Sequence, residues 1–248
     1  MIEIKYLKAF KDNYIWLIKN NDDVIVIDPG ESAQVVDYIT INNLKLNCIL
    51  LTHSHPDHIG GVANLLDYFG NVPIYGANCY ATISVSDLDI IEILPEVSIK
   101  VLATPGHTMD GVSFLLNDKH LFCGDTLFAG GCGRVFTGDY NLMYTSIVKI
   151  KNLYKSNNNV LIYPAHEYTL SNLRFGITIE PNNIDIINRI KQVEDIRSNN
   201  GITLPTNLEL ELKTNPFLRC NLKQNVYKSD YLNELEEFTQ IRKRKDIF

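Results

Sequence analysis

The stretch Thr52-His53-Ser54-His55-Pro56-Asp57-His58 places three histidines and an aspartate within seven residues. It follows the apolar run Cys48-Ile49-Leu50-Leu51, which is typical of a buried strand. After it, residues 59–69 have apolar side chains at helical spacing. We therefore expect the cluster to lie on a turn that leads from a strand into a helix.

The four ligand-type side chains of this turn predict a metal site. Residues two apart at the end of a strand project to the same side, so His53 and His55 can bind one ion together. Asp57 and His58 would lie at the mouth of the helix, where they could bind a neighbouring ion. A single histidine is more often a hydrogen-bonded core residue, but three beside an aspartate would be costly to bury unpaired. Imidazole and carboxylate suit zinc, iron and manganese.

Length and composition are those of a globular protein. The chain has 248 residues, of which 45% are hydrophobic, and a formal net charge of -6. This is enough for one large domain or two unequal ones, and the negative charge argues against a nucleic-acid partner. No apolar run reaches the roughly twenty residues of a membrane helix, and the N-terminus lacks the apolar core of a signal peptide. We expect a cytoplasmic protein with no membrane partner.

Two further patterns argue against other kinds of site. The five cysteines are scattered without short paired spacing, so neither a disulfide framework nor a cysteine zinc site is indicated. Residues 129–134 form a glycine-rich loop that lacks the lysine-serine ending of a phosphate-binding loop.

Strand patterns and helix patterns alternate along the first two thirds of the chain, which argues for a layered α/β architecture. Residues 84–93 match neither pattern. The expected strands are 14–18, 24–27, 48–51, 72–75, 98–103, 112–116, 120–123 and 160–163, and the expected helices are 31–40, 59–69 and 142–154.

Ligand-type residues recur directly after three of these strands. His107 follows strand 98–103, Asp125 follows strand 120–123, and His166 follows strand 160–163. An isolated aspartate there more often caps the next turn. The repetition favours a shared site, because open sheets place their sites at strand ends.

The C-terminal part has a different character. Residues 182–196 carry an amphipathic helical stripe, and Leu232 to Ile241 suggests another helix. We expect a small helical domain beside the α/β one. The basic cluster that begins at Arg242 would by composition be a solvated tail.

These features together resemble the metallo-β-lactamase superfamily and, within it, the glyoxalase II (hydroxyacylglutathione hydrolase) family. The superfamily signature His-x-His-x-Asp-His is present at 53–58. The resemblance implies a four-layer αββα sandwich over residues 1–166 and a helical substrate-binding domain over residues 167–248. The other supporting segments are 104–108, 124–128, 131–134, 165–169, 215–219 and 242–246.

The resemblance also implies the metal chemistry. Two divalent ions, zinc in the first place and iron or manganese as alternatives, would generate a hydroxide that attacks a thioester carbonyl. A thiolate leaves readily, so no catalytic serine or cysteine is assigned. The implied ligands are His53, His55 and His107 for one ion and Asp57, His58 and His166 for the other, with Asp125 bridging; Asp57 and Asp125 count as catalytic.

The implied substrate is S-D-lactoylglutathione, cleaved to D-lactate and glutathione in methylglyoxal detoxification. We expect the protein to be a monomer. Its glutathione part would be bound by Arg134, Tyr168, Arg242 and Lys245. Helical spacing puts the last two on one face. The chain departs from the family at Phe136, where some members have tyrosine, and at residues 137–139.

Two other functions are compatible with the residues. One is a different reaction on the same fold, such as that of a lactamase, a persulfide dioxygenase or a nuclease. A dioxygenase would use one iron, whereas His58 and His166 supply a second site, and a nuclease should be more basic. The other is a catalytically silent metal-binding protein, which the loss of a ligand would have favoured.

Overall fold

The structure, a computed structural model, describes residues 2–220, 222 and 233–248. The chain forms two compact units by its internal contacts. The first comprises Met1–Ala103 and Asp110–Gly124, and the second Thr104–Met109 and Asp125–Phe248. Among the described helices none is both long and apolar enough to cross a membrane.

A six-stranded sheet in the order β1-β2-β3-β4-β5-β6 forms the first half of the first unit. The first three strands are antiparallel neighbours, and the later neighbours are parallel. Parallel strands need crossover connections, which helices supply between β3 and β4 and between β4 and β5. The elements are β1 (Ile2–Ala9), β2 (Asn13–Asn20), β3 (Asp23–Ile27), α1 (Ala33–Ile41), β4 (Lys45–Leu50), α2 (Pro56–Ile59), α3 (Val62–Phe69), β5 (Ile74–Gly76) and β6 (Ile83–Ser84).

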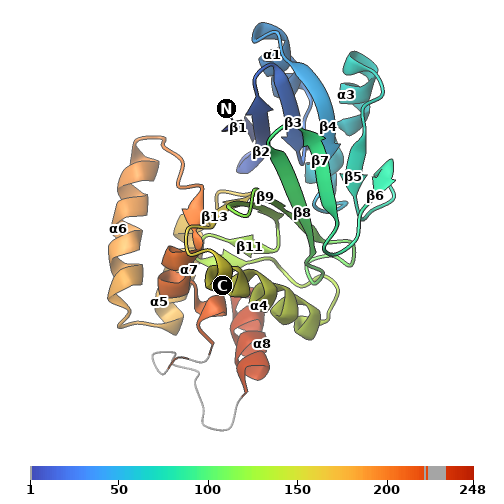
Figure 1. Cartoon of the computed structure of the whole chain (residues 1–248). Helices are drawn as coiled ribbons and strands as arrows, with labels where there is room; N and C mark the ends of the chain where they lie inside the picture. The colour runs from blue at the N-terminus through green and yellow to red at the C-terminus, as the bar shows by residue number, and fades with distance from the viewer. Residues whose placement is uncertain (1, 221, 223–232) are drawn as a thin grey trace. The chain divides into compact units, whose positions relative to one another are not determined.

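Alternation along the central strands divides the side chains of this sheet between two buried faces. Ile15, Leu17 and Val24 pack with residues of α1 and α3, which lie along one face of the sheet (Figure 1). The intervening Trp16 points the other way, and its ring centroid lies 6.5 Å from that of Phe122. Burial on both faces explains why β2 and β3 are apolar runs.

The second half of the first unit is an antiparallel meander of β7 (Ile90–Leu94), β8 (Val97–Ala103), β9 (Val112–Leu116) and β10 (His120–Gly124). The β9–β10 hairpin is the predicted one. Strand β7 overlaps residues 84–93, for which the sequence predicted no element. Its side chains are mostly exposed or half-buried, so the strand lacks a clear pattern of buried apolar positions.

The predicted helix over residues 59–69 is interrupted. It divides at Gly60 and Gly61 into α2 and α3. A Cβ atom at Gly60 would lie 2.7 Å from the Gly30 carbonyl oxygen, and one at Gly61 would lie 2.7 Å from that of Pro29. The backbone after β3 thus presses against the helix at this point, a contact that periodicity cannot reveal.

The second unit is mainly helical. Its strands are short: β11 (Leu127–Phe128) pairs with β12 (Gly131–Cys132), and β13 (Leu161–Pro164) pairs with β14 (Thr206–Asn207). The helices are α4 (Tyr140–Ser156), α5 (Thr169–Ile179), α6 (Ile184–Ser198), α7 (Leu208–Thr214), a 3-10 turn (Pro216–Leu218) and α8 (Glu234–Lys245).

The helices expected over 142–154 and 182–196 are present as α4 and α6. The helix expected from Leu232 begins in the structure at Glu234, and Leu232 itself lies outside the described residues. We did not predict α5 or α7. Asparagine or aspartate side chains accept backbone N–H bonds at the starts of α4, α6, α7 and α8, and these caps fix where each helix begins.

Candidate metal centre and adjoining cavity

The histidine turn leaves the end of β4 as predicted. His53 and His58 are buried, and the distance from Nε2 of His53 to Nδ1 of His55 is 3.1 Å. The Nδ1 atom of His53 lies 3.1 Å from the Thr52 hydroxyl, which itself donates to Asp28. Nδ1–H of His53 therefore donates to that hydroxyl, and Nε2 carries the lone pair that a metal needs.

Asp28 is a functional residue that we did not assign from the sequence. Its carboxylate accepts from the backbone N–H and the hydroxyl of Thr52, at 2.8 and 2.6 Å, and Oδ2 lies 3.0 Å from Nδ1 of His58. It thus orients both buried histidines of the turn through their Nδ1 sides. The sequence could have indicated Asp28 as a candidate, because it directly follows the apolar strand β3 in the same way as the other candidate ligands follow theirs.

Asp57 is held in the first turn of α2. Asn13 donates to its Oδ2 atom at 3.0 Å, and the same oxygen lies 3.5 Å from Nε2 of His58. A Cβ atom at Gly30 would lie 1.9 Å from the Asp57 carbonyl oxygen, so only glycine fits there. The aspartate and His58 therefore present their ligand atoms side by side.

The second unit contributes His107, Asp125 and His166, all buried. Oδ2 of Asp125 lies 3.4 Å from Nε2 of His107, and Oδ1 lies 3.3 Å from Nε2 of His166. Each oxygen of one carboxylate thus faces a different imidazole. This is the arrangement that a carboxylate bridging two ions requires.

His107 is oriented by the glycine-rich segment. Its Nδ1–H donates to the Arg134 carbonyl oxygen at 2.8 Å, which leaves Nε2 as the atom directed at Asp125. A Cβ atom at Gly133 would lie 2.0 Å from the Asp125 carbonyl oxygen and 3.0 Å from Nδ1 of His107. Glycine is therefore needed for this segment to approach both ligands.

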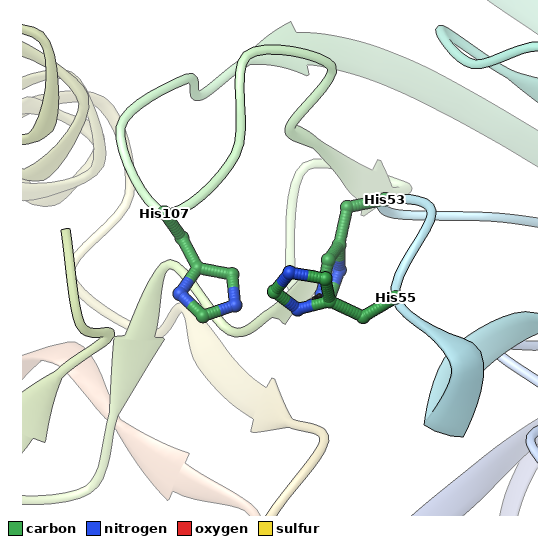
Figure 2. Close-up of side chains that lie close together, drawn as sticks. All are labelled: His53, His55 and His107. Carbon is green, nitrogen blue, oxygen red and sulfur yellow. Dashed lines mark hydrogen bonds between the residues drawn. The ribbon is translucent and has the colours of Figure 1, made fainter. Parts of the chain in front are cut away.

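Three groups of candidate ligands each offer atoms that lie within 4.8 Å of one another. The first is His53, His55 and His107, whose imidazoles lie close together (Figure 2). The other two are Asp28, His53 and His58, and Asp57, His58 and His166. The chemistry of these donors, neutral imidazole and carboxylate, fits zinc, iron or manganese.

A cavity of about 330 Å³ in the second unit is lined by two predicted metal ligands and by the predicted substrate contacts. His107 and Asp125 line it, as do all four of the residues predicted to bind glutathione, Arg134, Tyr168, Arg242 and Lys245. The basic C-terminal cluster is therefore part of a folded cavity, and the tail that composition alone suggested is wrong for Arg242, which is buried in α8.

The two arginines of the cavity share one carboxylate. Oδ1 of Asp246 lies 3.3 Å from Nε of Arg134 and 3.1 Å from Nη2 of Arg242. Nη1 of Arg242 also donates to the Cys132 carbonyl oxygen at 2.7 Å. Its buried Nε makes no hydrogen bond with the described residues. Arg134 is more than half exposed, so its charge remains accessible to a ligand.

Aromatic rings lie beside two residues of the cavity wall, Tyr168 and Lys245. The Tyr168 ring stacks on that of His166, with centroids 4.7 Å apart. The ammonium of Lys245 lies 5.0 Å from the ring centroid of Phe175 and 5.1 Å from that of Phe248. Burial, with Arg242 nearby, lowers the pKa of Lys245 to about 8.

The family departures have local structural roles. Phe136 lines the cavity with its ring centroid 5.3 Å from that of His107. Thr137 donates from its hydroxyl to the Gly106 carbonyl oxygen at 2.8 Å, next to His107. Asp139 caps α4 by accepting from the N–H groups of Asn141 and Leu142. Thr137 and Asp139 thus hold the segment after Phe136 against Gly106 and at the start of α4.

None of the five cysteines is positioned as a nucleophile. All but Cys79 are buried. Cys132 lines the cavity, but burial raises the pKa of its thiol to about 11, so it is protonated at neutral pH.

Two family models match adjoining parts of the chain. The metallo-beta-lactamase superfamily matches residues 10–166, and the hydroxyacylglutathione hydrolase C-terminus matches residues 167–248. A hydroxyacylglutathione hydrolase from Erwinia tasmaniensis is 42% identical over 253 residues, which cover 98% of each chain. The chain belongs to the hydroxyacylglutathione hydrolase family.

Other similar proteins agree with this assignment. The hydroxyacylglutathione hydrolase of Haemophilus ducreyi is 38% identical over 251 residues, with full coverage of both chains. The solved structure of ETHE1 from Myxococcus xanthus matches with a TM-score of 0.67 and 24% identity, over 97% of this chain and 90% of that one. This likeness shows the metallo-β-lactamase fold. The predicted fold class is confirmed, and the family implies a dinuclear metal site built from histidine and aspartate.

Proposed function

We propose that the protein hydrolyses S-D-lactoylglutathione to D-lactate and glutathione, the second step of methylglyoxal detoxification. The family supplies the class of reaction, metal-dependent thioester hydrolysis. The observation in this chain that supports it most is the cavity in which the Asp125 carboxylate lies with Arg134, Arg242 and Lys245. A thioester held there would have its anionic glutathione part beside cations and its carbonyl near metal ligands.

The proposed ligands form two sets that share one carboxylate. His53, His55 and His107 would hold one ion and Asp57, His58 and His166 the other, with one oxygen of Asp125 on each. The opposed contacts of the two Asp125 oxygens, 3.4 Å to His107 and 3.3 Å to His166, support this sharing. Zinc is the proposed metal at both positions, with iron and manganese as the alternatives.

When bound, such ions supply Lewis acidity and a water that is deprotonated near neutral pH. The chain's own residues prepare the site for them. Asp28 and the Arg134 carbonyl accept Nδ1–H bonds from His58 and His107, which keeps both rings in the tautomer whose Nε2 carries a lone pair. Because these bonds already orient both rings, the rings need little reorganisation when a metal binds.

The recognition residues would bind the glutathione part by charge. Glutathione ends in carboxylates, which Arg134 and Lys245 can meet from the cavity wall, and the buried Nε–H of Arg242 is a further donor. Tyr168 adds a hydroxyl. The glutathione thiolate needs no protonation to leave, so we assign no general acid. The Cys132 thiol, whose pKa burial raises to about 11, has no role in the reaction.

The same proposal gives the protein a small-molecule partner. Action as a monomer in the cytoplasm, with no nucleic-acid or membrane partner, remains a prediction.

Purified protein loaded with zinc should hydrolyse S-D-lactoylglutathione with about two metal ions bound per chain. The control substrate is a lactoyl thioester of a thiol that lacks the glutathione carboxylates, which should be cleaved at least tenfold less efficiently in kcat/KM. Two bound ions without hydrolysis of the glutathione ester would overturn the proposed substrate and leave the metal site. Fewer than two ions in a fully active protein would overturn the dinuclear assignment.

A further inference from the structure

The β11–β12 hairpin lies against three proposed metal ligands of the second unit. It begins two residues after Asp125, and Gly133 beyond it donates its N–H to the Thr126 carbonyl oxygen at 3.2 Å. The Phe128 ring centroid lies 5.9 Å from that of His166. Arg134, which follows the hairpin, accepts the Nδ1–H bond of His107. A shift of this hairpin would therefore displace ligand atoms.

Helix α7 and the turn after it hold the hairpin from behind. The Asn215 side chain is fully buried, and its Nδ2 donates to the carbonyl oxygens of Phe128 at 3.2 Å and Gly131 at 3.0 Å. Oε2 of Glu211 accepts from the Gly130 N–H at 2.8 Å and from Nδ2 of Asn215 at 3.0 Å. Two side chains thus bind three successive parts of the hairpin, one strand, the turn and the other strand.

The donors and acceptors of this network are fixed by their own partners. Oδ1 of Asn215 accepts from the Phe217 N–H at 3.1 Å, which settles which end of the amide faces the hairpin. Oε1 of Glu211 accepts from the Thr206 hydroxyl at 2.7 Å. Burying a carboxylate and an amide is costly unless every partner is present, so the network favours one position of the hairpin.

We infer that Asn215, held by Glu211, is a positioning residue for the metal ligands His107 and Asp125, acting through the β11–β12 hairpin. This inference rests on the proposed metal assignment. It gives a role to the segment Asn215-Pro216-Phe217, whose place in the reaction neither the metal chemistry nor the cavity explains.

Asn183 provides a matched control for Asn215. It is also a buried asparagine of the second unit. Its Oδ1 accepts from the N–H groups of Asp185 and Ile186, and its Nδ2 donates to Glu180 and to the Lys213 carbonyl oxygen. The first two bonds cap α6, the other two join the side chain to Glu180 and to Lys213 of α7, and none involves the hairpin. Its loss should therefore cost similar stability with no effect on the metal ligands.

The experiment measures zinc affinity by chelator competition, together with the unfolding temperature, for the wild type, Asn215→Ala and Asn183→Ala. Both variants should unfold at lower temperature than the wild type. Asn215→Ala should bind zinc about 10–100-fold more weakly, the usual effect of losing a group that supports a metal ligand. Asn183→Ala should bind zinc within about twofold of the wild type, the scatter expected for a site with unchanged ligands.

Glu211→Gln serves as a second variant if Asn215→Ala does not fold. It keeps the side-chain volume and removes the charge that accepts from Gly130 and Asn215, and its zinc affinity should fall in the same direction. Zinc affinity equal to that of Asn183→Ala, in whichever of the two variants folds, would overturn the positioning role. Failure of the wild type to bind zinc would instead overturn the metal assignment and this inference with it.

Discussion

Asp125 is the ligand that the two proposed metal sites share. Replacing it with alanine removes the only carboxylate among the described residues whose two oxygens face both His107 and His166. We expect kcat to fall by about a thousandfold or more, since the shared ligand and the geometry of both ions are lost together. Steady-state kinetics with metal analysis on the same sample checks this, and retained activity with two ions bound would contradict it.

Phe136 lines the cavity at a position where some members of the family have tyrosine. Its ring lines the cavity and is largely exposed, so Phe136→Tyr can add an oxygen without a packing cost. One added hydrogen bond to substrate should lower KM for S-D-lactoylglutathione by roughly threefold to tenfold, with kcat unchanged. An unchanged KM would place this ring away from the bound glutathione.

We expect Lys245 to make substrate binding sensitive to pH. Because burial lowers the pKa of its ammonium to about 8, the cation is present below that pH and is lost as the pH rises through it. KM should therefore rise between about pH 7.5 and 9, while kcat stays level over the same range. Lys245→Arg keeps its charge and should abolish this rise, so KM profiles of the two proteins test the assignment.

Asp139, one of the residues at which the chain departs from the family pattern, caps helix α4. Asp139 accepts two backbone N–H bonds there, and Asp139→Ala should lower the free energy of unfolding by about 1 kcal/mol. Chemical denaturation measures this loss. Asp139→Asn, which keeps the accepting oxygen, should recover most of it, and zinc affinity should be unchanged in both variants.

Metal removal tests the molecule as a whole. Bound ions stabilise only the folded protein, because the unfolded chain does not hold the proposed ligands in place. Zinc at about a thousand times its dissociation constant would add about 4 kcal/mol for one site, and a chelator should lower the unfolding temperature by roughly 10 °C. Calorimetry with and without chelator measures the shift, and an unchanged temperature would contradict metal binding in the folded state.

Much of the candidate site could be predicted from the sequence because its residues follow apolar strands. His53, His107, Asp125 and His166 each stand directly after such a strand, where the pattern of the chain itself marks the end of a buried element. The helices of the second unit were predicted less well. Helix α7 alternates leucine with charged residues, which is a strand-like period, and its buried Glu211 violates the expectation that a carboxylate faces water.

The sequence by itself determined the order of strands and helices and the candidate ligands at strand ends, because periodicity and local spacing are properties of neighbouring residues. The family resemblance supplied the fold and the proposed assignment of ligands to ions. Only the tertiary structure decided that Asp28 orients His58, that Arg242 is buried against the Cys132 carbonyl, and that Asn215 holds a hairpin 84 to 87 residues earlier in the chain. Each of these contacts joins residues distant in sequence through buried polar groups. Their energy depends on which partners the completed fold brings within hydrogen-bonding distance, and no local pattern records that.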